Sequence, residues 1–217
     1  MGIRSSAAAA ASIAIALTLL ISGCAPSSPT ETTGPGESPD PTPTSTPPAE
    51  PEAPPALVLS VDGISLEDGD GNEVASAPRD APDQVIQLVT DALGAPTSTS
   101  SDPFGDHFEW AGVGVDSRGW ATVGFSTASS GGYDLRAEDG ITVGSTRADV
   151  LALTPLDVAY DGDGDGKSDS LGLEPEPEPG TESLAHPGNV GTSYIEAFFA
   201  GDEVSRLVSP WGDWRDI

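Results

Sequence analysis

The sequence predicts an α+β domain in which short helices pack on an antiparallel sheet. Three patterns support this prediction: apolar residues recur at helical spacing over 85–93, polar and apolar residues alternate in several short runs, and Asp-Gly dipeptides separate those runs. Residues 57–217 are numerous enough for one domain with its own core. Because the chain has 1 cysteine, no disulfide framework supports this core.

The domain begins with a predicted β-hairpin. Leu57, Leu59 and Val61 recur at every second position and so share one face of a strand. Asp62-Gly63 is a hairpin-type dipeptide, and apolar residues resume at Ile64. The glycine- and aspartate-rich stretch 68–72 predicts another turn, after which Val74 resumes a strand.

The first helix has both start and stop signals. Asp80 or Asp83 is positioned to cap it, and an apolar stripe covers 85–93. Gly94 ends the helix, and Pro96 lies just beyond. A strand pattern then covers 107–115, followed by a hairpin turn over 116–119 and a returning strand over 120–125.

The second half begins again near residue 139. Residues 139–143 (Asp-Gly-Ile-Thr-Val) echo residues 62–66 (Asp-Gly-Ile-Ser-Leu), which leaves open whether the domain holds two tandem helix–sheet units. A short helix is expected next, capped by Ser145 or Thr146.

Further elements are expected in this half. The short helix should turn Val150, Leu151 and Leu153 toward the core, and strand residues should follow at 158–160. Two strong strand patterns, 194–199 and 204–208, are joined at Gly201-Asp202.

The first 23 residues have the organisation of a secretory signal, with Arg4 before an apolar run. That run ends at Ile21-Ser22-Gly23-Cys24, which predicts a lipobox whose cysteine becomes the lipid-modified N-terminus, carrying acyl chains such as palmitate. The alternative is a retained membrane-spanning anchor, for which the run is short. Residues 24–56 then form a disordered Pro/Ser/Thr-rich linker, since 25–56 hold 11 of the 21 prolines. These features place the protein on the extracytoplasmic face of the cell membrane.

The lipobox and the linker resemble those of small secreted lipoproteins of Gram-positive bacteria. The segment from Gly140 to Val150, which opens a helix-then-sheet unit, also resembles such proteins. The paired unit is similar to the beta-lactamase-inhibitor-protein-like fold, in which short helices pack on an antiparallel sheet. This resemblance implies protein binding or assembly, with an unknown protein partner, rather than catalysis.

The chain is strongly acidic, with a formal net charge of -27. Removal of 1–23 takes away Arg4 and no acidic residue, which leaves 7 basic against 35 acidic side chains, or -28. Such a charge keeps an extracellular protein soluble and repels nucleic acid. We therefore expect no nucleic-acid partner, and contact with the membrane only through the N-terminal lipid.

The most specific candidate for a metal site is the loop 161–169. It offers oxygen ligands at Asp161, Asp163, Asp165 and Asp169, with a glycine at the sixth position, as at the start of a calcium loop. Gly172 stands where such a loop has its bidentate glutamate, and Glu174 is the nearest substitute. Weak calcium binding and a solvated acidic loop both remain open.

Two other segments have competing interpretations. The run Glu174-Pro175-Glu176-Pro177-Glu178-Pro179 is either a solvated loop, which is favoured, or a recognition segment for a basic partner. Trp211 and Trp214 are either packed in the core, which is favoured, or an exposed ligand platform.

The sequence favours a lipid-anchored binding or assembly module, stabilised by calcium if the loop 161–169 binds it, over an enzyme. His107 and His186 are not spaced for zinc, and no Gly-x-Ser-x-Gly, Ser-x-x-Lys or Walker motif occurs. The alternative is a surface hydrolase with paired carboxylates, for which Glu109 and Asp134 are candidates. A solute-binding lipoprotein is disfavoured because residues 57–217 are few for two lobes.

Overall fold

The structure is a computed structural model that describes residues 53–158 and 160–216. The predicted signal peptide 1–23, Cys24 and most of the 24–56 linker therefore lie outside the described residues. Within the described residues, no helix is long and apolar enough to cross a membrane.

The larger sheet has eight strands, and each of its strand pairs is antiparallel. Its strands, in spatial order, are β10 (Leu156–Asp157), β11 (Ser170–Glu178), β13 (Gly191–Ala200), β14 (Glu203–Asp213), β7 (Ala121–Phe125), β6 (Val113–Ser117), β5 (Gly105–Trp110) and β4 (Ser98–Asp102).

The smaller sheet has five strands and contains one parallel pair, formed by β1 and β9. Its spatial order is β3 (Glu73–Pro78), β2 (Gly63–Glu67), β1 (Ala56–Ser60), β9 (Tyr133–Ala137) and β8 (Ser129–Ser130). Two short strands, β12 (Thr181–Glu182) and β15 (Arg215–Asp216), pair with each other.

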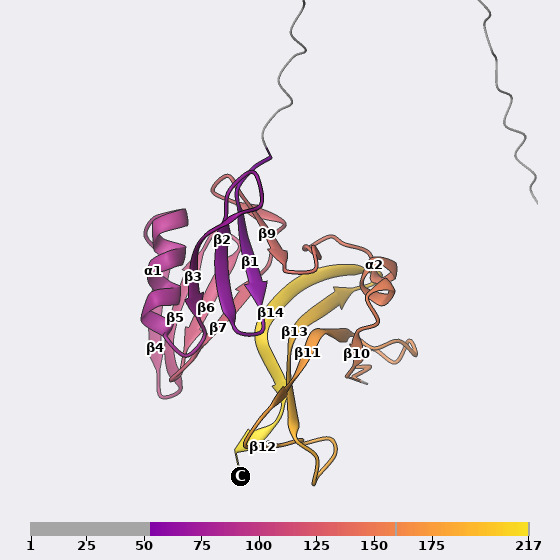
Figure 1. Cartoon of the computed structure of the whole chain (residues 1–217). Coiled ribbons are helices and arrows are strands. Elements are labelled where there is room, and N and C mark those ends of the chain that lie inside the picture. Colours follow the sequence, from indigo (N-terminus) through magenta and orange to yellow (C-terminus); the bar gives the residue numbers. More distant parts are fainter. Residues whose placement is uncertain (1–52, 159, 217) are drawn as a thin grey trace, which may run out of the picture. The chain divides into compact units, whose positions relative to one another are not determined.

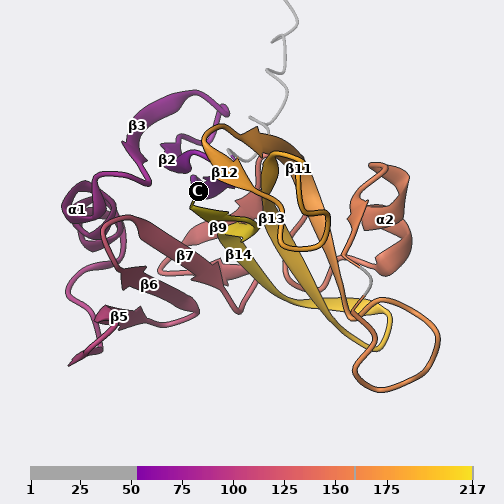
Figure 2. The ribbon, with the colours of Figure 1, turned by 90° about the horizontal axis from the view of Figure 1, so that it is seen from below.

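The described residues form two helices, α1 (Pro82–Leu93) and α2 (Arg147–Ala152), which lie at opposite ends of the domain (Figures 1 and 2). A single apolar core joins them to both sheets: it includes Leu57 and Leu135 from the smaller sheet and Phe125, Ile195 and Leu207 from the larger one. Each of these five side chains is fully buried. The predicted combination of short helices and mainly antiparallel sheet is therefore present, although strand dominates.

The larger sheet is assembled from two similar runs of elements. α1 is followed by β4, β5, β6 and β7, and α2 is followed by β10, β11, β13 and β14. The last strand of each run meets the other in the middle of the sheet, where Val208 pairs with Gly124. The two similar five-residue segments, 62–66 and 139–143, adopt different structures. Residues 63–67 form the strand β2, whereas the only β pairing of 139–143 is the isolated bridge between Thr142 and Arg136.

The first helix begins at Pro82 and has no aspartate as its N-cap residue. Ala81 is its N-cap residue and makes no side-chain capping bond, so the predicted cap by Asp80 or Asp83 is wrong. Pro82 fixes the first turn instead, because its φ is already helical and it lacks an N–H to satisfy. The predicted end is confirmed: the N–H of Gly94 donates to the Thr90 carbonyl, and Gly94 has a φ of 83°.

The second helix confirms one of its two predicted caps. The side chain of Thr146 accepts from the Asp149 N–H, and Asp149 in turn accepts from the Thr146 N–H, which is a capping box. Of the three residues expected in the core, only Val150 is buried, while Leu151 and Leu153 are 54% and 44% exposed. Six helical residues are too few for a wide apolar face.

The predicted hairpins β1–β2 and β13–β14 and the strand β7 are confirmed. The strand pattern over 107–115 is interrupted: β5 ends at Trp110 and β6 starts at Val113, because Gly112, with a φ of 81°, makes a tight turn between them. The strand expected at 158–160 is instead the short β10 at 156–157, and residue 159 lies outside the described residues.

The acidic proline-rich run 174–179 was expected to be a loop, and this expectation is wrong. Residues 170–178 form β11, which pairs with β13 through a bulge between Leu173 and Glu176. The bulge accommodates Pro175, because the irregular backbone there does not require its N–H, whereas Pro177 lies in the paired part of β11 opposite Thr192. Glu174 sits in this bulge with a φ of 50°.

Candidate ligand-binding site

Three of the four tryptophans line one hollow of about 590 Å³ on the larger sheet. We call it the aromatic hollow, and its lining residues are Asp116, Arg118, Trp120, Thr122, Arg206, Pro210, Trp211, Gly212 and Trp214. It lies where the two runs of elements meet, because its floor comes from β7 and its neighbour β14. Its volume lies within the range of about 300–1,000 Å³ that is typical of small-molecule sites.

The indole of Trp214 is positioned by two glycines. A Cβ atom at Gly212 would lie 2.1 Å from Nε1 of Trp214, and one at Gly191 would lie 2.2 Å from its Cβ. Only glycine at these two strand positions therefore leaves room for the indole. In this position, Trp214 packs against Trp120 with a ring-centroid distance of 5.6 Å and an interplanar angle of 55°.

Trp211 and Trp120 remain open to solvent, with exposed fractions of 46% and 40%. Trp211 and Phe198 pack edge to face, with their ring centroids 6.1 Å apart. This contact orients the Trp211 indole without burying it. Neither Trp211 nor Trp214 belongs to the apolar core. The prediction that these two tryptophans pack in the core is therefore wrong, and the platform interpretation is favoured.

The hollow also contains two arginines, Arg118 and Arg206, that form no close ion pair among the described residues, although the charge of Arg206 acts on the nearby Glu196 carboxylate. Among the described residues whose side chains are resolved, the other basic side chains form ion pairs with carboxylates; these are Arg79, Arg136, Arg147 and Lys167. Arg206 instead lies over Gly124, where a Cβ atom would be 3.3 Å from its guanidinium nitrogen. Arg118 stacks over the Phe104 ring at 5.2 Å. No sequence pattern singled out either arginine.

An aspartate–histidine–aspartate chain adjoins the hollow. Nδ1 of His107 lies 2.5 Å from Asp116, and its Nε2 lies 3.2 Å from Asp102. Hydrogen bonds to Asp116 and then to Asp102 raise the pKa of His107, since both carboxylates favour the charged imidazolium. The two carboxylates contact opposite ring nitrogens, so the histidine has no free nitrogen with which to bind zinc.

The loop 161–169 brings together three of its four predicted ligands. Carboxylate oxygens of Asp161, Asp163 and Asp169 lie within 4.8 Å of one another. Oxygens that surround one calcium ion at 2.3–2.6 Å can be this far apart, so the three residues fit calcium. Asp165 is outside this group and accepts from the Lys167 N–H.

Glu174 does not complete the calcium loop. Its carboxylate accepts from the Asp139 N–H at 3.1 Å, in the loop that follows β9. Burial, followed by the charges of Asp139 and Glu138, raises the pKa of Glu174 to about 7. Burial also raises the pKa of Asp139. This acidic contact ties the bulge of β11 to the segment that precedes α2.

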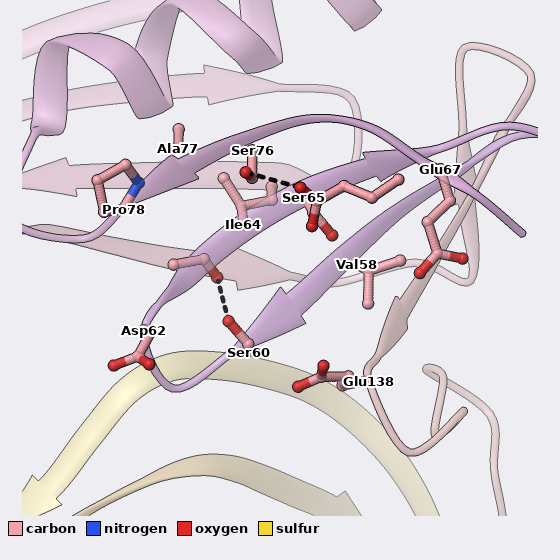
Figure 3. Close-up of a pocket in the computed structure, with 12 residues that line it drawn as sticks. Val58, Ser60, Asp62, Ile64, Ser65, Glu67, Ser76, Ala77, Pro78 and Glu138 are labelled. Atoms are coloured by element: carbon pink, nitrogen blue, oxygen red, sulfur yellow. Dashed lines mark hydrogen bonds between the residues drawn. The ribbon is translucent and has the colours of Figure 1, made fainter.

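A second hollow, of about 260 Å³, lies on the smaller sheet (Figure 3). Figure 3 shows the carboxylates of Asp62, Glu67 and Glu138 well separated along it. Glu67 is ion-paired with Arg136, and no arginine, lysine, histidine or aromatic residue lines this hollow. The hydrolase candidates Glu109 and Asp134 lie on β5 and β9, which belong to different sheets, and neither lines the aromatic hollow or this second hollow.

No family model, curated protein or solved structure matches the chain. The candidate site therefore rests on the chemistry of the aromatic hollow itself.

Proposed function

We propose that this protein is a lipid-anchored extracytoplasmic binding module whose ligand site is the aromatic hollow. The observation that carries the proposal is the presence of two exposed tryptophans, Trp120 and Trp211, beside Arg118 and Arg206, which form no close ion pair among the described residues. Large apolar rings in water and guanidinium groups that do not contact a carboxylate are both stabilised by a ligand that covers them.

The other sequence predictions fit this function. Lipidation of Cys24 would hold the domain at the membrane, and the 24–56 linker would let it reach the surrounding envelope. We also propose two tandem helix–sheet units, duplicated near residue 139, as in the beta-lactamase-inhibitor-protein-like fold. The matching order of helix and strands in the two halves supports this proposal.

The binding function is tested by capture of solubilised envelope components on full-length protein in detergent. We expect a retained component whose capture is lost in Trp211→Ala and in Arg206→Gln. Tyr160→Ala and Lys167→Gln are matched controls, because Tyr160 is 64% exposed and both residues lie outside the hollow. Capture that is equal for all five proteins, or absent from all, contradicts the proposal.

We further propose that the loop 161–169 binds calcium and stabilises the domain. Three converging carboxylates of Asp161, Asp163 and Asp169 support this, with the remaining ligands supplied by water or backbone oxygens. Because one predicted carboxylate and the closing glutamate are missing from the group, the expected affinity is in the range of about 10⁻⁴–10⁻³ M typical of extracellular modules.

A further inference from the structure

The aromatic hollow combines features that select one class of ligand. We propose that it binds an anionic saccharide chain, an inference that rests on the proposed binding function. The sugar rings stack on the indoles of Trp120 and Trp211, and the acidic groups pair with Arg118 and Arg206.

The ring component follows from the tryptophans. The apolar C–H face of a pyranose is flat and matches an indole face in size, whereas its hydroxyls require polar partners at the edge. Asp116 and Thr122 supply a carboxylate and a hydroxyl at the wall of the same hollow. A purely apolar ligand would leave these polar groups desolvated, which disfavours it.

The acidic component follows from the arginines. In a mature chain with 7 basic and 35 acidic side chains, a guanidinium that forms no close ion pair is unexpected, yet two line the hollow. Arginine binds carboxylate or phosphate through paired N–H donors. A neutral saccharide would leave both guanidinium groups without a hydrogen-bonded anion.

A chain is favoured over a single sugar because the platform is extended and open. Trp120, Trp211 and Trp214 come from two separate segments, the β6–β7 turn and the end of β14 with the residue beyond it. Two of these rings remain 40% and 46% exposed, so the hollow does not enclose its ligand. Successive sugar units can therefore lie across it.

Isothermal titration calorimetry of full-length protein in detergent tests the inference with three probes. Oligogalacturonate carries rings and charge, a maltodextrin of equal length carries rings alone, and poly-L-glutamate carries charge alone. We expect oligogalacturonate to bind at least about tenfold more tightly than either control, since maltodextrin cannot form charge-assisted hydrogen bonds with the arginines and poly-L-glutamate has no sugar rings to stack on the indoles. Trp211→Ala should weaken it by about tenfold or more, Arg206→Gln should remove the preference over maltodextrin, and Tyr160→Ala should leave it unchanged.

Three results would overturn the inference: no binding of oligogalacturonate, equal binding of poly-L-glutamate, or equal binding of maltodextrin by the unmutated protein. The envelope-capture experiment separates this failure from failure of the binding function. If capture still depends on Trp211 and Arg206, the hollow binds a ligand of another class. Circular dichroism of each variant verifies folding, and Arg206→Lys, which keeps the charge, should retain part of the affinity.

Discussion

Glu174→Gln is expected to stabilise the protein at alkaline pH. Glu174 is held in the bulge of β11, where burial and the neighbouring charges of Asp139 and Glu138 raise its pKa to about 7. The folded state therefore binds a proton more tightly than the unfolded chain, in which the ordinary value is 4.5. The contribution of Glu174 to stability is therefore fully present below pH 4.5 and is lost as the pH rises through about 7.

The size of the effect follows from this pKa. Raising the pKa from 4.5 to about 7 corresponds to about 3 kcal/mol at full effect, since each pH unit is worth 1.36 kcal/mol. Because the side chain is only partly buried, water screens the penalty, and we expect about 1–2 kcal/mol. Glutamine keeps a carbonyl oxygen to accept from the Asp139 N–H, so the existing hydrogen bond is preserved.

Urea denaturation at pH 4 and pH 8 measures this difference. The free energy of unfolding of Glu174→Gln should equal that of the unmutated protein at pH 4 and exceed it at pH 8. Glu203→Gln, at an exposed strand end, is the matched control for the glutamate-to-glutamine change. A variant that is less stable at pH 8, or equally stabilised at both pH values, would refute the reasoning.

Three other predictions concern separate parts of the molecule. In NMR titrations, His107 should have a pKa above its ordinary 6.5, and Asp116→Asn should lower it, because that carboxylate is the largest cause of the shift; an unchanged pKa in the variant would contradict this. Millimolar calcium should raise the melting temperature, and Asp163→Asn should reduce the gain; a melting temperature that ignores calcium in the unmutated protein would exclude the site. Cys24→Ser should move the protein from the membrane fraction to the medium in cell fractionation, and retention in the membrane would favour an uncleaved anchor.

Local sequence signals predicted the elements that carry strong patterns. The apolar stripe over 85–93 predicted α1, and Gly94 predicted where α1 ends. The strand patterns over 194–208 predicted the central hairpin of β13 and β14. β4 was missed because all five of its residues are exposed and none is apolar, as an edge strand permits. β11 was missed because its prolines argue against a strand unless a bulge is present.

The candidate site was harder to predict because it depends on strand pairing between distant segments. Trp211 was singled out, but Trp120 joins it only because β7 pairs with β14 in the middle of the sheet. The scarcity of basic residues could have pointed to Arg118 and Arg206, because a chain with so few of them uses each one in a specific interaction or site. Only the folded structure shows which of these basic residues form no close ion pair.

The most direct test of the binding function is NMR of full-length protein with ¹⁵N-labelled tryptophan, titrated with solubilised envelope material. Trp110 serves as an internal reference, because it is buried and its indole N–H donates to the Gly94 carbonyl. If the aromatic hollow is the binding site, the indole N–H signals of Trp120, Trp211 and Trp214 should shift while that of Trp110 stays in place. Envelope material that leaves these three signals unmoved would contradict binding at the aromatic hollow.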